Sequence, residues 1–179
     1  VDVEGRRWGL VAIYEMPFLG FTDEQLHLLA VLGGYLADFL MDANDAASQL
    51  GRSAQAFLRG LTRAESDRRL YRVGSALGRM SFSRQAEALG AVDLFLSRKR
   101  GLDREWLVRD LDGNAVLLLL MPLGDRSGFA GYRARMRRDL EENYGERLNE
   151  SDVVFTVELL KGKRNPEQWL EHLRSTYEL

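Results

Sequence analysis

Apolar positions follow two different spacings along the chain, and the spacing predicts where helices and strands lie. Behind Thr22, leucines recur every three or four residues, which is typical of an amphipathic helix that ends near residue 43. Strand-like apolar runs lie at residues 7–16, 74–82, 105–109, 114–121 and 153–160. Helical spacing returns at residues 84–98, at residues 127–144 and in a last helix that begins at Pro166.

Residues 74–179 therefore read β-α-β-β-α-β with a terminal helix. This order predicts an α+β fold with a ferredoxin-like core, an antiparallel sheet that carries both helices on one face. Asp112 and Gly113 form a strong hairpin signal between the second and third strands. The strand at residues 114–121 is apolar throughout, so we expect it at the centre of the sheet.

The segment between the two parts keeps helical spacing but is polar and rich in arginine. We expect it to connect the domains as one or two helices, with breaks at Gly51 or Gly60. The predicted organisation is an N-terminal part at residues 1–43, a helical linker at residues 44–73 and a second domain at residues 74–179.

Composition removes several classes of function. The net charge of −2 provides no basic field for non-specific binding of duplex nucleic acid. The chain has no cysteine and only two histidines, which leaves little material for a thiolate nucleophile or a zinc site. The longest apolar run, residues 115–121, is much shorter than the roughly 20 residues that span a membrane. The positive charge comes from 22 arginines and three lysines, and arginine pairs well with phosphates and nucleobases.

A two-metal catalytic centre needs acidic residues on more than one element. The strand at residues 74–82 carries no aspartate or glutamate, and the acidic residues of the hairpin, Asp110 and Asp112, lie together on one tight turn. Turn chemistry alone explains an aspartate before Gly113. We therefore assign no catalytic residue and no metal ligand.

The pattern R-x-x-D occurs twice, at Arg100/Asp103 and at Arg109/Asp112, close to the number that chance predicts from the composition. Either pair could form a helix-end or turn ion pair, which contributes little at a surface. Position separates the two, because Arg100 and Asp103 lie in the turn between a predicted helix and the first hairpin strand. Asp103 is followed by five residues and then by Arg109-Asp110-Leu111-Asp112-Gly113.

Over residues 74–179 the chain resembles the GGDEF (diguanylate cyclase) family, in which an inhibitory R-x-x-D site lies five residues before the signature. Here the signature glycines are replaced by Arg109 and Asp110, and the acidic residue of the first strand is missing. The resemblance therefore implies a degenerate GGDEF domain that binds cyclic di-GMP without catalysis.

Residues 1–43 resemble the last strand and closing helix of a GAF domain. A GAF domain followed by such a GGDEF domain resembles the PelD family of cyclic di-GMP receptors. In that family a further arginine on the next helix completes the site, and Arg135, 35 residues after Arg100, occupies the matching place. From the residues alone, Arg135 fits a solvated face that it shares with Arg133, Arg137 and Arg138.

The ligand's chemistry agrees with this resemblance. Guanine offers the acceptors O6 and N7 to an arginine fork, and its N1 and N2 donors suit the carboxylate of Asp103. We expect Arg100, Asp103 and Arg135 to bind cyclic di-GMP, which often binds as an intercalated dimer, with no other cofactor.

The resemblance implies regulation of Pel exopolysaccharide export and biofilm formation, with membrane export components as partners. It implies the cytoplasmic portion of a bacterial inner-membrane protein and allows a homodimer through the GAF part or the linker helices. Two alternatives stay open: a ligand-free GAF–GGDEF interaction or dimerisation module, and an active diguanylate cyclase.

Overall fold

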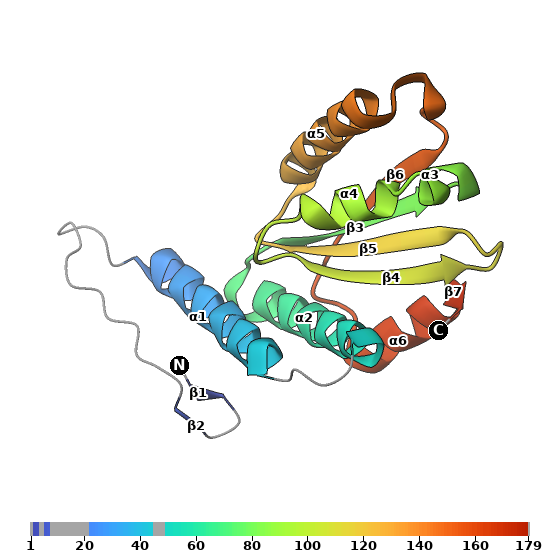
Figure 1. The fold of residues 1–179 in the computed structure, drawn as a ribbon. Coiled ribbons are helices and arrows are strands. Elements are labelled where there is room, and N and C mark those ends of the chain that lie inside the picture. The colour runs from blue at the N-terminus through green and yellow to red at the C-terminus, as the bar shows by residue number, and fades with distance from the viewer. Residues whose placement is uncertain (1, 4–5, 8–21, 45–48, 179) are drawn as a thin grey trace.

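The computed structural model describes residues 2–3, 6–7, 22–44 and 49–178 (Figure 1). The predicted strand at residues 7–16 and the turn that follows lie, except for Arg7, outside the described residues. The N-terminal elements are β1 (Asp2–Val3), β2 (Arg6–Arg7), α1 (Asp23–Asn44) and α2 (Gln49–Tyr71). The remaining elements are β3 (Ser75–Phe82), α3 (Arg84–Ala88), α4 (Ala91–Ser97), β4 (Arg104–Asp110), β5 (Ala115–Pro122), α5 (Arg126–Tyr144), the 3-10 turn η1 (Gly145–Arg147), β6 (Val153–Leu159), α6 (Pro166–Arg174) and β7 (Tyr177–Glu178).

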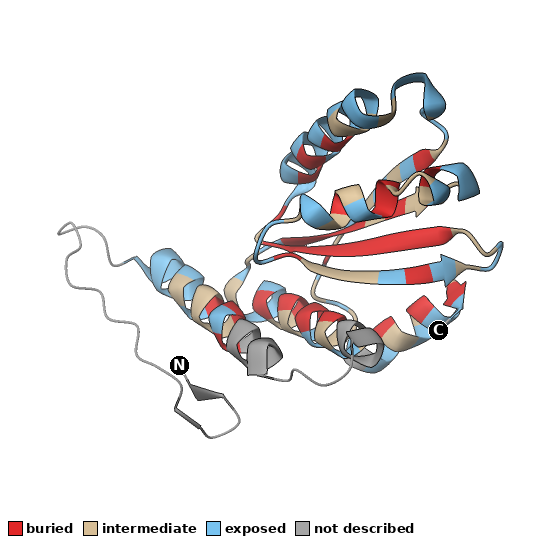
Figure 2. Ribbon diagram, in the orientation of Figure 1, coloured by how far each residue is buried: buried red, intermediate tan, exposed pale blue. Residues whose placement is uncertain are grey.

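The strand β5 is the centre of a five-stranded antiparallel sheet with the order β6-β3-β5-β4-β7. All eight residues of β5 are buried, which confirms the central position predicted from its apolar run (Figure 2). The predicted β-α-β-β-α-β order is also confirmed. The sheet has an additional strand, β7, which was not predicted because two residues are too few to show a strand pattern.

Helices cover both faces of this sheet. The helices α3, α4 and α5 lie on one face, as the ferredoxin-like arrangement predicts, whereas α2 and α6 cover the other (Figure 1). Phe57, Leu61 and Ala64 of α2 are wholly buried against the sheet, although the sequence suggested only a connecting helix. These three residues are spaced by four and three positions, so they form an apolar stripe on one side of the helix, and this stripe already indicated that α2 packs on the sheet.

Glycines account for two differences between the predicted and observed helices. Gly51 and Gly60 do not interrupt α2, and at Gly60 a Cβ would come within 2.9 Å of Leu120, so the missing side chain lets α2 approach β5 closely. The predicted helix at residues 84–98 is instead divided into α3 and α4 at Gly90. This glycine has a φ of 80°, a left-handed conformation that ends the first helix.

Helix starts follow their predicted caps with one change. Thr22 and Gln25 exchange backbone-to-side-chain hydrogen bonds of 3.3 Å at the start of α1, and Ser83 caps α3. The helix predicted from Ser127 is capped by Asp125, whose carboxylate accepts from the Gly128 N–H at 2.7 Å. No helix of the described chain is both long enough and apolar enough to cross a membrane.

Gly78 lies in the middle of β3 and does not interrupt the strand. At Gly78 an added Cβ would lie 2.5 Å from the Phe129 ring, so glycine lets α5 pack directly on the middle of β3.

We predict that Gly78→Ala lowers the free energy of unfolding by about 1–3 kcal/mol, because the new methyl group must displace the packed Phe129 ring. Urea denaturation measures this change. Gly101→Ala is the matched control, because an added Cβ there meets no atom within 4 Å, and its stability should change by less than about 1 kcal/mol. Equal stability of Gly78→Ala and the wild type would show that Phe129 does not pack as described.

Candidate functional site: the turn at Arg100 and Asp103

Arg100 and Asp103 form a closed turn at the start of β4. The Asp103 N–H donates to the Arg100 carbonyl at 3.0 Å, and the Arg100 N–H donates back to Oδ2 of Asp103 at 3.0 Å. The guanidinium adds hydrogen bonds from Nη2 and Nε to Oδ1 of Asp103, at 2.7 and 3.0 Å. Nη2 also donates to the Pro122 carbonyl at 3.3 Å, which ties the turn to the end of β5. The R-x-x-D pair predicted from its position is therefore a defined structural unit.

The two side chains differ in exposure, and this separates their roles. Asp103 is wholly buried, whereas the Arg100 side chain is 48% exposed. Both Asp103 oxygens accept from Arg100, so the carboxylate does not face solvent as the expected guanine contact requires. The structure instead makes Asp103 the group that orients Arg100. Nη1 of Arg100 makes no hydrogen bond within the described residues, so this nitrogen stays available to an acceptor on a ligand.

Arg135 on α5 reaches the same region through Tyr132. Its guanidinium carbon lies 5.5 Å from the centre of the Tyr132 ring, which is a cation–π distance. No hydrogen bond or ion pair joins Arg135 to Arg100 or Asp103 in the described part of the chain. Arg135 is exposed, so its guanidinium is accessible to an anionic or aromatic ligand.

Tyr132, in the helix predicted at residues 127–144, lies next to the predicted site residues Asp103 and Arg135, although no sequence signal singled it out. It packs in the apolar core beside Phe95 and Phe129, but its hydroxyl has no hydrogen-bond partner among the described residues. Burial raises the pKa of this hydroxyl, the negative charge of Asp103 raises it further, and Arg135 opposes the shift. Tyr132 therefore lies within the electrostatic reach of both Asp103 and Arg135. Only the rotation of α5 in the folded chain could reveal this.

The second R-x-x-D pair does not form a comparable unit. Arg109 donates through Nη1 and Nη2 to the Glu87 carboxylate at 2.8 and 2.5 Å, and it also donates to the Gly113 carbonyl at 3.0 Å. This pairing lowers the pKa of Glu87. Asp110 accepts from the N–H groups of Asp112 and Asn114, at 3.1 and 2.9 Å. Arg109 and Asp110, the charged residues at the signature position, thus form hydrogen bonds that stabilise the hairpin.

The surroundings of Arg100 are open. An added Cβ at Gly101, next to Arg100, would meet no atom within 4 Å. A hollow of about 380 Å³ separates the turn from α1 and is lined by Leu32, Tyr35, Leu36, Arg100, Gly101 and Leu102. The turn thus has free space on the side of α1, where a planar ligand can approach.

The family of the chain follows from its sequence. The sequence profile of the PelD GGDEF domain matches residues 52–175, well over half of the chain. The chain belongs to the PelD GGDEF family. The match starts within α2, so the family's domain includes the helix that covers the second face of the sheet.

Solved structures of PelD from Pseudomonas aeruginosa agree with this family. PelD of strain PAO1 in complex with cyclic di-GMP is 30% identical with a TM-score of 0.66, and the match covers 91% of this chain and 57% of that one. PelD of strain PA14 is 28% identical in its apo form and in its cyclic di-GMP complex, with TM-scores of 0.66 and 0.67. Both PA14 matches cover 90% of this chain, which spans 55% of the length of those PelD chains. No curated protein sequence matches the chain.

Together these matches confirm the expected PelD-like, degenerate GGDEF domain with an α+β fold. The matched PelD structures include complexes with cyclic di-GMP, the ligand that the resemblance implied.

We predict that Tyr132→Phe makes the protein more resistant to alkaline unfolding. Burial raises the pKa of the Tyr132 hydroxyl in the folded state above its ordinary value of 10.0. The contribution of Tyr132 to the free energy of unfolding is therefore fully present below pH 10.0. The contribution is lost as the pH rises above that value, because the unfolded chain then ionises the tyrosine first. The variant lacks this loss. Thermal melts at increasing pH measure the difference.

Near neutral pH the same substitution should change the stability by no more than about 1 kcal/mol, because it removes a buried hydroxyl that has no partner. Tyr144→Phe is the control, since its ring lies at a half-buried position at the other end of α5. If Tyr132→Phe and the wild type lose the same stability at alkaline pH, the hydroxyl of Tyr132 is not buried as described.

Proposed function

We propose that this chain is a non-catalytic receptor domain for cyclic di-GMP that binds the dinucleotide at Arg100 and Arg135, with Asp103 holding Arg100 in place. The observation that carries the proposal is the buried Asp103 carboxylate, which fixes the guanidinium of Arg100 and leaves Nη1 available. The complexes of related PelD proteins with cyclic di-GMP support the choice of ligand.

The chemistry of the two arginines suits this ligand. Cyclic di-GMP has two phosphates and two guanines, so it offers both anionic oxygens and the O6 and N7 acceptors. Arg100, held at its Nε and Nη2, presents Nη1 with little further loss of side-chain entropy. Arg135 lies within cation–π distance of the Tyr132 ring, and its exposed guanidinium can stack on a purine. A ligand that bridges the turn and α5 can also bind as an intercalated dimer, because the side facing α1 is open.

Arg109 and Asp110 support a receptor rather than a cyclase. A cyclase needs its hairpin to hold a triphosphate with its metal ions. Here the Arg109 cation is paired with Glu87, and the Asp110 carboxylate braces the turn. Incubation with GTP and Mg²⁺ should therefore yield no cyclic di-GMP, and detection of that product would contradict the non-catalytic assignment.

In the cell, we propose that the chain is the cytoplasmic portion of a bacterial inner-membrane protein and that binding regulates Pel exopolysaccharide export and biofilm formation. Binding can shift a conformational equilibrium only if the two states have different affinities for the ligand. The turn at Arg100 borders α1 across the hollow described above, and α1 is therefore the element through which occupancy would be transmitted.

We predict that Arg135→Ala weakens binding of cyclic di-GMP about 5- to 150-fold, the equivalent of one lost arginine–guanine contact of about 1–3 kcal/mol. Isothermal titration calorimetry measures the change. Arg133→Ala is the matched control, because Arg133 is an exposed arginine two residues earlier on the same helix. Equal weakening by both variants would mean that α5 attracts the ligand by charge alone.

We predict that Asp103→Asn weakens binding at least about tenfold, because the neutral amide no longer fixes the Arg100 guanidinium. We choose Asp103→Asn because asparagine keeps the volume of the buried side chain. Arg100→Ala is less suitable, since it would leave the buried carboxylate of Asp103 without its cation, which costs about 3–5 kcal/mol of stability. Arg109→Ala should leave binding unchanged. Tight binding by folded Asp103→Asn, or loss of binding in Arg109→Ala, would place the ligand elsewhere.

A chain that binds no cyclic di-GMP would instead support the ligand-free interaction module.

A further inference from the structure

The strand β6 leaves one edge of the sheet open. Among the described residues β6 pairs only with β3, in a regular register from Val153 to Leu159 without a bulge. Sheet edges of soluble proteins are normally protected by lysine, proline, a bulge or a covering element. This strand contains neither lysine nor proline, and Val154 is 50% exposed. An edge of this kind is a template for another strand.

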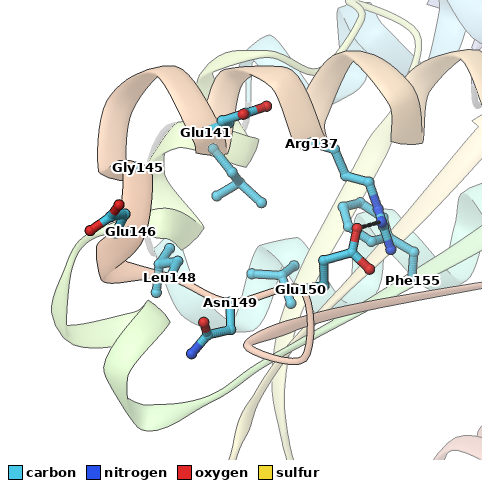
Figure 3. A pocket seen from close by; sticks show the side chains of 10 residues that line it. Arg137, Glu141, Gly145, Glu146, Leu148, Asn149, Glu150 and Phe155 are labelled. Carbon is cyan, nitrogen blue, oxygen red and sulfur yellow. Dashed lines mark hydrogen bonds and ion pairs between the residues drawn. The ribbon is translucent and has the colours of Figure 1, made fainter.

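A pocket of about 430 Å³ lies at the N-terminal end of this strand, between α5, η1 and the turn before β6 (Figure 3). Its apolar floor consists of Leu140, Leu148, Val153 and Phe155. Three glutamates line it from α5, η1 and the turn: Glu141, Glu146 and Glu150. An apolar floor among carboxylates suits a lysine side chain, whose methylene stem packs on the floor while the ammonium group meets the carboxylates.

The pocket carries excess negative charge. Arg137 is paired with Glu150 at 2.7 Å, and its guanidinium lies 6.0 Å from the centre of the Phe155 ring (Figure 3). Glu141 and Glu146 form no ion pair with any described residue. The C-terminal end of α5 adds partial negative charge at Gly145. A cation from outside the domain is therefore favoured here.

The chain carries suitable cations at the opposite end of the same strand. Lys161 and Lys163 are exposed and form no ion pair with described residues, while Arg164 is paired with Glu158 at 2.9 Å. Leu159 packs on the side of α5 and Leu160 on the side of α2. The Leu160 N–H still donates to the Ser75 carbonyl beyond the end of β6, so we infer that the alternation continues and that Lys161 lies on the face of the pocket.

We propose that two copies of this chain pair through β6, antiparallel and around a two-fold axis. Antiparallel pairing sets the C-terminal end of one β6 beside the N-terminal end of the other, so Lys161 of each copy reaches the glutamates of the other copy's pocket. The two-fold axis makes the contact twice. The strands β3 and β5 separate β6 from β4, which follows the turn at Arg100, so the interface is distinct from the proposed ligand site.

Sedimentation equilibrium with charge-reversal variants tests this interface. The wild-type chain should show a weight-average mass that rises with concentration from 20.4 kDa toward twice that value. A loop variant (Lys161→Glu with Lys163→Glu) and a pocket variant (Glu141→Lys with Glu146→Lys) should each dimerise at least about tenfold more weakly, because like charges meet at both ends of the interface.

An equimolar mixture of the two variants should dimerise again, because each altered end then meets an opposite charge. Binding of cyclic di-GMP and the circular dichroism spectrum should be unchanged in both variants, which separates the interface from misfolding. A wild-type chain that stays at 20.4 kDa at every concentration would overturn the proposal and leave the edge to another protein. Variants that dimerise as the wild type does, or a mixture that fails to recover, would also overturn it.

Discussion

The ion pair between Arg100 and Asp103 is the interaction on which the site depends. A carboxylate with no exposed surface is costly unless every oxygen is satisfied, and Arg100 satisfies both oxygens from its side chain and its backbone. The same contacts close the turn before β4 and connect it to Pro122 at the end of β5. A single pairing thus fixes the local fold and leaves the half-exposed Arg100 side chain with one nitrogen, Nη1, for a ligand.

The rest of the sheet holds this turn in place. The fully buried β5 pairs with β4 on one side and β3 on the other, and helices cover both faces. Glycine at position 78 lets Phe129 pack on β3, and Tyr132 packs in the same core with Arg135 over its ring. At the other end of the sheet, the pair of Arg109 with Glu87 occupies the signature hairpin. One end of the sheet therefore carries the proposed ligand site, and the other carries the ion pair that stabilises the hairpin.

Local sequence signals predicted much of this arrangement. The apolar run of β5, the Asp112-Gly113 hairpin and the spacing of Arg100 and Asp103 each act over a few residues, so the sequence alone indicates them. The burial of Asp103 and the position of the Tyr132 hydroxyl depend on how α5 is rotated against the sheet, and no local pattern encodes that rotation. The role of α2 was visible in the spacing of Phe57, Leu61 and Ala64, but its many polar residues favoured a linker.

The most direct test of the central claim is a crystal structure of this chain with cyclic di-GMP. We expect a guanine or phosphate within hydrogen-bond distance of Nη1 of Arg100, a contact from the same ligand to Arg135, and an Asp103 carboxylate that still accepts from Arg100. Ligand density at the signature hairpin, or an Arg100 turned away from both Asp103 and the ligand, would contradict this claim.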